Sequence, residues 1–355
     1  MRFKPVEYME WVKTRKPAAF DLTKSSVRNM QLAELELDFS ALELTGNNAY
    51  GYRPLMEKIA GCYDVEEDCV VSTLGTSHAL YLVCAALCEM GDRVLVEDPV
   101  YEPLLAVPRS FSVNTARLTR RFEDGFKLIP DIVQSALEEK TRLIILTNIH
   151  NPSGAWNDPL SLEKICVMAE RVGAMVLIDE VYLDFMMSPK NESSFHLGDN
   201  VIVISSLTKV YGLGGLRCGW IIAPPVLAAE LRRVVDHVNV EGVYVGDLIS
   251  DEVWGRRDSI RTNLRDSIRT NHQIVKEWVE SEPGLSWVEP DGGVVCFPRI
   301  ETGCTGSELE AVLLRDHDTG IVPGRFFGRE KHFRLGFGGS ADILKQALFH
   351  IHSAL

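Results

Sequence analysis

The stretch from Val201 to Trp220 contains residue types that suit covalent bonding to a carbonyl compound next to a phosphate. It opens with the apolar run Val-Ile-Val-Ile, which predicts a buried strand. The segment Ser205–Lys209 and a glycine-rich loop with Arg217 follow. A lysine amine deep in a protein has a lowered pKa and is a better nucleophile, while hydroxyls and a guanidinium are donors for a dianion. The pattern favours a lysine that forms a Schiff base, although a single lysine is more often an ordinary surface residue.

Other expected strands and helices carry residues that suit the same ligand. Asp179 follows a buried strand, at the carboxyl end where open α/β sheets bind ligands, and an acid there can pair with a protonated ring nitrogen. Tyr101 follows another strand, where an aromatic ring can stack on a planar ligand. The run Gly75-Thr76-Ser77 opens a long apolar helix, whose free N–H groups and positive dipole end attract an anion. Asn151 lies in an Asn-Pro-Ser-Gly turn after a further strand, although Asn-Pro by itself is a common turn signal.

These motifs together resemble the class I/II aminotransferase branch of the fold-type-I enzymes that use pyridoxal phosphate (PLP). The resemblance runs from about residue 20 to the end, and its most specific part is Ser206, Thr208, Lys209, Arg217 and Gly219 with the glycines between them. It implies that Lys209 is the catalytic residue and binds PLP as a Schiff base. The cofactor-binding residues that it implies are Gly75, Thr76, Ser77, Tyr101, Asn151, Asp179, Tyr182, Ser206, Thr208, Arg217 and Tyr50.

The same resemblance assigns residues to the substrate and to a partner subunit. Arg334 would clamp the substrate α-carboxylate, because a guanidinium fork matches a carboxylate. The arm around Asp21–Ser26 would close over the substrate, with Ser26 as our candidate contact and Ser25 or a solvated loop as alternatives. Tyr50 would cross a dimer interface to the partner's cofactor phosphate, with Tyr52 or an ordinary packed tyrosine as alternatives.

Strands alternate with helices through the middle of the chain, which predicts an α/β fold with a mostly parallel, doubly wound sheet. The resemblance implies the PLP-dependent transferase fold of type I, with a seven-stranded sheet between helices and a smaller α+β domain. We expect an N-terminal arm and part of the small domain at 1–45, and a large PLP-binding domain with a long connecting helix at 46–275. The C-terminal small domain is expected at 276–355.

Composition excludes several classes of protein. The 355 residues carry a formal net charge of -13, which argues against nucleic acid or an anionic membrane as partner. The eight cysteines form no Cys-x-x-Cys pair, so we expect no metal site. No apolar run is long enough for a membrane span and no signal sequence is evident. We therefore expect a cytoplasmic enzyme.

The expected activity is transfer of an amino group from an L-amino acid to a 2-keto acid, in a homodimer with shared active sites. The segments DLTKSS, HNPSGA, PDGGVVCFPR and IVPGRFFG look most like a subgroup of capreomycidine synthase-like enzymes, some of which cyclise an amino acid. Elimination, racemisation and cyclisation on the same scaffold therefore stay open. A PLP-sensing regulator is disfavoured, because such proteins carry an added DNA-binding domain and this chain is acidic.

Overall fold

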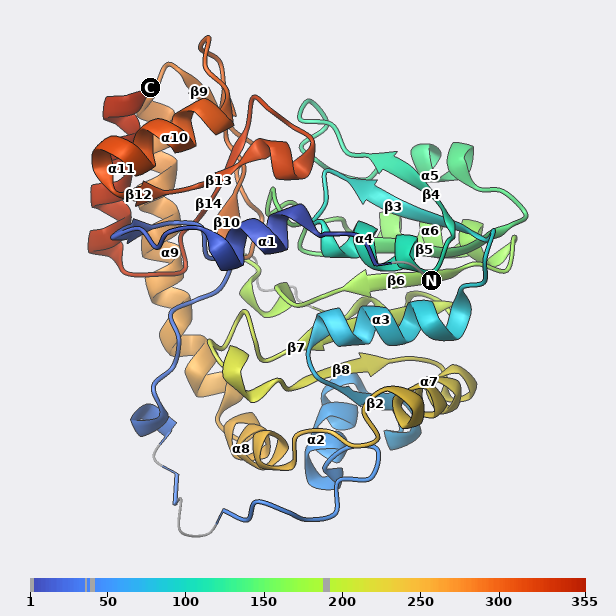
Figure 1. Ribbon diagram of the computed structural model, residues 1–355. Helices are drawn as coiled ribbons and strands as arrows, with labels where there is room; N and C mark the ends of the chain where they lie inside the picture. The colour runs from blue at the N-terminus through green and yellow to red at the C-terminus, as the bar shows by residue number, and fades with distance from the viewer. Residues whose placement is uncertain (1–2, 36, 39–41, 188–191) are drawn as a thin grey trace.

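The computed structural model describes residues 3–35, 37–38, 42–187 and 192–355. Figure 1 shows a large twisted sheet with helices on both faces and a second, smaller group of strands and helices above it. The strands of the large sheet are β2 (Val70–Thr73), β3 (Arg93–Asp98), β4 (Asn114–Thr119), β5 (Thr141–Thr147), β6 (Met175–Asp179), β7 (Val201–Ser206) and β8 (Gly219–Ile222).

The order of strands in this sheet is β2-β8-β7-β6-β5-β3-β4. The neighbours from β7 to β4 run parallel, whereas β8 is antiparallel to both β7 and β2. Strand β7, which lies between β8 and β6, is buried along its whole length, as expected for a strand of a sheet covered on both faces. The prediction of a mostly parallel seven-stranded sheet is confirmed.

Two hydrophobic cores lie on the opposite faces of the sheet, because neighbouring residues of a strand point to opposite sides. Along β5, Leu143 and Ile145 belong to one core, whereas Ile144 and Leu146 belong to the other. The helices of this part are α2 (Arg53–Tyr63), α3 (Thr76–Leu87), α4 (Pro103–Ser110), α5 (Pro130–Ala136), α6 (Pro159–Glu170), α7 (Pro225–Val238) and α8 (Tyr244–Trp254). The first core includes side chains of α3, α4 and α7, and the second includes those of α2 and α6.

The smaller group contains short strands and three longer helices. Its strands form pairs or triplets, β1 with β12, β9 with β11, and β10-β14-β13. Their bounds are β1 (Phe20–Asp21), β9 (Leu285–Ser286), β10 (Val295–Cys296), β11 (Arg299–Ile300), β12 (Thr319–Gly320), β13 (Val322–Pro323) and β14 (Phe333–Gly336). The helices are α9 (Arg257–Ser281), α10 (Gly306–His317) and α11 (Ala341–Ala354). The expected domain boundary at 275 falls inside α9, which runs from the large sheet to this group (Figure 1).

The N-terminal part connects the two groups. Helix α1 (Glu7–Thr14) precedes residues 22–30, which we call the arm. The arm bonds the smaller group through Leu22, whose carbonyl accepts from Gly336 N over 2.7 Å. It bonds the large sheet's loops through Val27, whose N–H donates to the carbonyl of Lys209 over 3.0 Å. The arm therefore lies across the junction of the two groups.

The short 3-10 helices are η1 (Leu32–Leu35), η3 (Glu67–Cys69), η4 (Leu183–Phe185), η5 (Ser194–Leu197), η6 (Gly214–Leu216) and η7 (Gly324–Phe327). Within the described residues, none of the helices combines the length and the apolarity needed to cross a membrane.

Candidate active site

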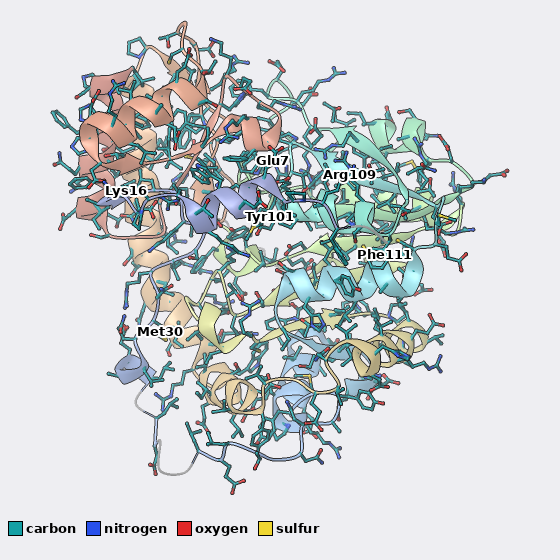
Figure 2. All side chains as sticks on the ribbon, in the orientation of Figure 1. Glu7, Lys16, Met30, Tyr101, Arg109 and Phe111 are labelled. Atoms are coloured by element: carbon teal, nitrogen blue, oxygen red, sulfur yellow. The ribbon has the colours of Figure 1, made fainter. Side chains whose placement is uncertain are left out.

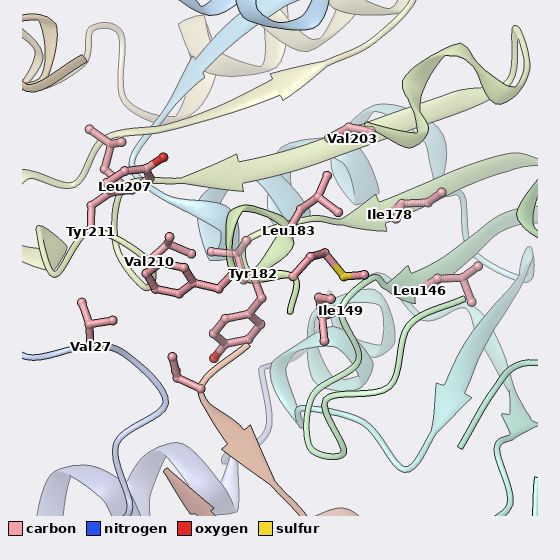
Figure 3. Packing of buried hydrophobic residues seen from close by; sticks show 14 of the residues in the cluster. Val27, Leu146, Ile149, Ile178, Tyr182, Leu183, Val203, Leu207, Val210 and Tyr211 are labelled. Carbon is pink, nitrogen blue, oxygen red and sulfur yellow. The ribbon is translucent and has the colours of Figure 1, made fainter. Parts of the chain in front are cut away.

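The candidate residues gather where parallel strands end. Thr147 at the end of β5 pairs in register with Asp179 at the end of β6, and Asp179 pairs with Ile204 near the end of β7. Figure 3 shows the buried faces of these strands, with Leu207 and Tyr182 beyond their carboxyl ends. The topology therefore places Asp179 and Lys209 at the same edge of the sheet.

A cavity with about 370 Å³ of empty space lies at this edge. It lies at the ends of β5 and β6, the starts of α3 and α4, and the loops that follow the strands. The residues that line it are Thr76, Tyr101, Leu104, Thr147, Ile149, Asn151, Asp179, Val181, Tyr182 and Lys209. Six of the sequence-predicted residues (Thr76, Tyr101, Asn151, Asp179, Tyr182 and Lys209) thus share one cavity.

Lys209 has the electrostatic surroundings of a nucleophilic amine. Burial, together with the charge of Arg334, lowers the pKa of Lys209 to about 8, although the charge of Asp179 opposes the shift. The amine donates a hydrogen bond to Ser25 Oγ over 3.1 Å. About one tenth of this amine is therefore unprotonated at pH 7, far more than for an ordinary lysine.

Asp179 and Tyr182 lie on the strand-to-loop segment that follows β6. Burial raises the pKa of Asp179 to about 7, against the hydrogen bond that Val181 N donates to its carboxylate over 3.0 Å. Burial also raises the pKa of Tyr182 to about 12, so this phenol keeps its proton. The Tyr182 hydroxyl donates to the Ser25 carbonyl over 2.6 Å.

Arg334 is fully buried on β14 and its guanidinium contacts neutral oxygens. It donates to Asn151 Oδ1 over 3.0 Å, to Tyr8 Oη over 2.7 Å and to the Thr23 carbonyl over 3.1 Å. Among the described residues, no carboxylate forms an ion pair with it. In the part of the chain that the structure describes, Arg334 is therefore a buried cation without a counter-ion.

Arg120 is a second buried arginine of this chain, and unlike Arg334 it has a carboxylate partner. It is as deeply buried as Arg334, yet its guanidinium pairs with the carboxylate of Glu97 over 2.6 Å. Because a buried charge is costly unless it is paired, the guanidinium of Arg334, which has no carboxylate partner among the described residues, suits an anion that arrives with a ligand.

The start of α3 forms a tight cradle with the loop of Arg217. Gly75 has a φ of +94°, and a Cβ there would lie 2.7 Å from Arg217 Nη2. Arg217 donates to the Leu74 carbonyl over 2.5 Å and to the Gly214 carbonyl over 3.0 Å. Thr76 begins the helix and faces the cavity, while Ser77 is exposed in the first turn. A glycine, helix N–H groups and an arginine together suit a phosphate.

Ser206 and Thr208 shape the turn that presents Lys209. Ser206 is buried at the end of β7, and its hydroxyl accepts from Thr208 N over 3.3 Å. This bond bends the chain out of the strand. Both side chains lie outside the cavity lining.

Three residues that were predicted, or considered as alternatives, for cofactor or substrate binding lie outside the lining of the Lys209 cavity. Tyr50 is 48% exposed, has a positive φ and bonds Asp236 over 3.2 Å. Tyr52 packs edge to face against Tyr244 within the chain. Ser26 has its carbonyl against Gly338, where a Cβ would lie 2.7 Å from the oxygen. The side chain that contacts Lys209 is that of Ser25, so Ser26 stays a prediction without a contact to the cavity.

Tyr8 and Thr147, which the sequence did not predict as site residues, also lie at the site. Tyr8 lies on α1, and its ring packs edge to face on Tyr101 with centroids 5.7 Å apart, in the region where Figure 2 labels Glu7 and Tyr101. Thr147 lines the cavity and its hydroxyl bonds both Glu97 and Asn151 N. The amphipathic pattern of residues 5–15 indicates a helix but not which part of the protein the helix covers.

The residues of the cavity fit pyridoxal phosphate. An aldehyde needs the free amine of Lys209, a ring nitrogen needs a buried acid such as Asp179, and a phenolic oxygen needs donors such as Tyr182 and Asn151 Nδ2. The cradle at Gly75, where an added Cβ would lie 2.7 Å from Arg217 Nη2, suits the phosphate. The donor set thus matches each polar group of the cofactor.

Known proteins resemble this chain over most of its length. The capreomycidine synthase of Streptomyces vinaceus is 32% identical over 289 residues, which are 81% of this chain and 74% of that protein. The arginine–pyruvate transaminase of Pseudomonas aeruginosa is 27% identical, with 86% and 81% covered.

Solved structures agree with the fold. A PLP-dependent aminotransferase from Streptococcus suis superposes with a TM-score of 0.95 at 26% identity, covering 100% of this chain and 98% of that one. The PLP-dependent cyclase OrfR superposes with a TM-score of 0.88 at 25% identity, covering 99% and 96%. The family model "Aminotransferase class I and II" matches residues 21–351. Because this model covers most of the chain and the capreomycidine synthase is more than 30% identical, this chain belongs to the class I and II aminotransferase family of PLP-dependent enzymes.

Proposed function

We propose that this chain moves an amino group from an L-amino acid to a 2-keto acid, with Lys209 as the residue that binds the cofactor covalently. The observation that carries the proposal is the buried, unpaired guanidinium of Arg334, whose charge lowers the pKa of the Lys209 amine. An α-amino acid supplies the carboxylate that Arg334 lacks and an α-proton for a base such as Lys209. The two groups together favour an amino acid over other amines.

In this proposal, each of four residues has a separate role in amino-group transfer. Arg334 binds the α-carboxylate through its two terminal nitrogens. Lys209, with a pKa of about 8, takes the α-proton as a general base and would return it to the former aldehyde carbon of the cofactor, across the amino nitrogen. Asp179 provides the acid group for the ring nitrogen, and Tyr182 a protonated phenol for the phenolic oxygen. Pyridoxal phosphate, when bound, withdraws electrons from the bond that breaks.

A second candidate is cyclisation or elimination of an amino acid. It is favoured by the 32% identity to a capreomycidine synthase and by the likeness to the cyclase OrfR. Both reactions use the same carboxylate site and the same α-proton removal. These reactions differ from amino-group transfer in which bond of the substrate changes after the α-proton has been removed.

The proposal includes a homodimer in which Tyr50 reaches the partner's cofactor phosphate. Tyr50 is nearly half exposed and lies outside the Lys209 cavity of its own chain. Tyr52, the alternative, is engaged with Tyr244. The exposed position therefore supports Tyr50 as the shared residue.

An absorption spectrum of the holoenzyme with a panel of amino acids tests these activities. In the absence of a keto acid, an amino donor should convert the visible cofactor band to that of pyridoxamine phosphate, and a 2-keto acid should restore it. A band that persists while ammonia or a cyclised product forms supports the second candidate. A protein that shows no visible band after incubation with PLP contradicts both.

A further inference from the structure

Ser25 contacts both Lys209 and Tyr182. Its side-chain oxygen accepts from Lys209 Nζ over 3.1 Å, and its backbone carbonyl accepts from the Tyr182 hydroxyl over 2.6 Å. Ser25 is 8% exposed, so water competes little for these bonds. One residue of the arm therefore meets two of the polar groups in the cavity.

The arm has little freedom to move Ser25 away from Lys209. On one side of Ser25, the Thr23 carbonyl accepts from Arg334 over 3.1 Å. On the other side, Val27 N donates to the backbone carbonyl of Lys209 itself over 3.0 Å. The serine is thus fixed to the residue whose amine it contacts.

We propose that the Ser25 hydroxyl is a positioning residue, which holds the Lys209 amine in place while that amine removes the substrate α-proton. The inference rests on the proposed function only for α-proton removal, a step that aminotransfer and cyclisation share. The lone pair of Nζ takes the proton, the C–H electron pair stays on the substrate, and the amine becomes an ammonium group. A hydroxyl can accept from an N–H in both states, because it has two lone pairs.

The competing role for this hydroxyl is a contact to the substrate carboxylate. That role predicts weaker substrate binding when the hydroxyl is removed. The positioning role predicts slower proton removal with unchanged binding, because the carboxylate site at Arg334 keeps its contacts with Asn151 and Tyr8. The two roles therefore separate in kcat and KM.

The test compares holoenzyme carrying Ser25→Ala with Ser25→Thr, which keeps a hydroxyl. Ser110→Ala is the matched control, since Ser110 is also buried and bonds a carbonyl of its own helix α4. We expect Ser25→Ala to lower kcat about tenfold, to enlarge the isotope effect of an α-deuterated amino acid, and to leave KM within twofold. Ser25→Thr should recover most of the rate.

Two binding measurements complete the test. An α-methyl amino acid has no α-proton, and its dissociation constant, followed by the cofactor absorbance, should be unchanged in Ser25→Ala. In protein stripped of cofactor, uptake of PLP requires the unprotonated amine. Loss of an acceptor for the ammonium form should move the pH midpoint of uptake down by about half a unit.

The outcomes separate this inference from the proposed function. Weaker binding of the α-methyl amino acid with an unchanged kcat assigns the hydroxyl to the carboxylate and overturns the inference. The inference is also overturned if Ser25→Ala has the same kcat and the same pH midpoint of PLP uptake as the control Ser110→Ala. If no amino acid changes the spectrum of the wild-type enzyme, the proposed function fails, while a shifted uptake midpoint still demonstrates the Ser25–Lys209 contact.

Discussion

The Glu102 carboxylate accepts a hydrogen bond from the backbone N–H of Tyr8 over 2.6 Å, across 94 residues of sequence. Its other oxygen accepts from Glu7 N over 3.1 Å. The first turn of a helix has N–H groups without intrahelical partners and carries a positive dipole. Glu102 therefore anchors α1 at the start of α4, and α1 in turn holds Tyr8 Oη 2.7 Å from Arg334.

Loss of the Glu102 anchor should raise KM for the amino acid more than it lowers kcat. Glu102→Ala frees the start of α1, so that Arg334 is held less firmly by Tyr8. Since a hydrogen bond to a charged group contributes about 1.5–3 kcal/mol, and α1 keeps its other packing, we expect KM for the amino acid to rise about three- to tenfold. Glu102→Gln, which keeps one acceptor, should lie in between.

Steady-state kinetics of both variants provide the measurement. Glu10→Ala is the control, because it removes an exposed carboxylate from the same helix. A fall in kcat with an unchanged KM for Glu102→Ala would show that α1 serves the chemical step and not binding.

The two buried arginines should respond differently to removal of their charge. Arg120→Met leaves the Glu97 carboxylate buried without its partner, which destabilises a protein by about 3–5 kcal/mol. Arg334→Met removes an unpaired charge, and the loss of three hydrogen bonds offsets that gain. We expect its free energy of unfolding to change by less than about 2 kcal/mol, while amino acid binding is lost.

Urea denaturation of the two variants, each with cofactor bound, distinguishes these cases. Equal destabilisation would mean that Arg334 has a counter-charge that the contacts around it do not reveal. Arg232→Met, on the outer surface of the large sheet's helices, controls for the loss of an arginine that donates to backbone carbonyls.

Uptake of PLP by the cofactor-free protein should depend on pH through Lys209. Burial lowers the pKa of Lys209 to about 8, so the reactive amine is about 1% of the total at pH 6 and about 10% at pH 7. The uptake rate should therefore rise about tenfold per pH unit up to 7 and level off above 9. Because the charge of Arg334 contributes to the lowered pKa, Arg334→Met should move the midpoint to higher pH.

Absorbance at the cofactor band, recorded after mixing at each pH, follows this reaction. The direction of the Arg334→Met shift is opposite to that expected for Ser25→Ala. A midpoint near the ordinary lysine value of about 10.4 would contradict the burial of the amine.

A shared active site predicts complementation between two inactive chains. Lys209→Ala removes the amine from its own site, and Tyr50→Ala removes a phosphate contact from the partner's site. A mixed dimer has one site with both defects and one with neither. Random reassembly of equal amounts should therefore restore about one quarter of the wild-type activity.

The activity of the mixture is compared with each variant alone at limiting PLP. Tyr52→Ala in place of Tyr50→Ala is the matched control, because Tyr52 packs inside its own chain. Activity that equals the average of the two separate variants would show that Tyr50 does not enter the partner's site.

The sheet and the strand-end residues were predictable because their signals are local. A buried apolar strand followed by an acid or a lysine is visible within ten residues, and parallel strands bring their carboxyl ends together. Asp179 and Lys209 therefore line one cavity as expected. The two-residue strands β9 to β13 have too little pattern to be recognised as a sheet.

The sequence alone does not indicate whether Ser25 or Ser26 contacts Lys209. Successive side chains of an extended segment point to opposite sides, so one of two adjacent serines faces Lys209. Which one it is depends on the backbone bonds of Leu22 and Val27, and these involve partners far along the chain. The pairing of Tyr8 with Arg334 has the same cause, because nothing local to either residue indicates the other.

The contact between Tyr8 and Arg334 joins residues 326 positions apart. Lys209 follows β7, whereas Arg334 lies on β14 near the end of the chain. The proposed carboxylate clamp can therefore form only when both ends of the chain have been synthesised, so a nascent chain that lacks β14 has the lysine but cannot hold a substrate carboxylate.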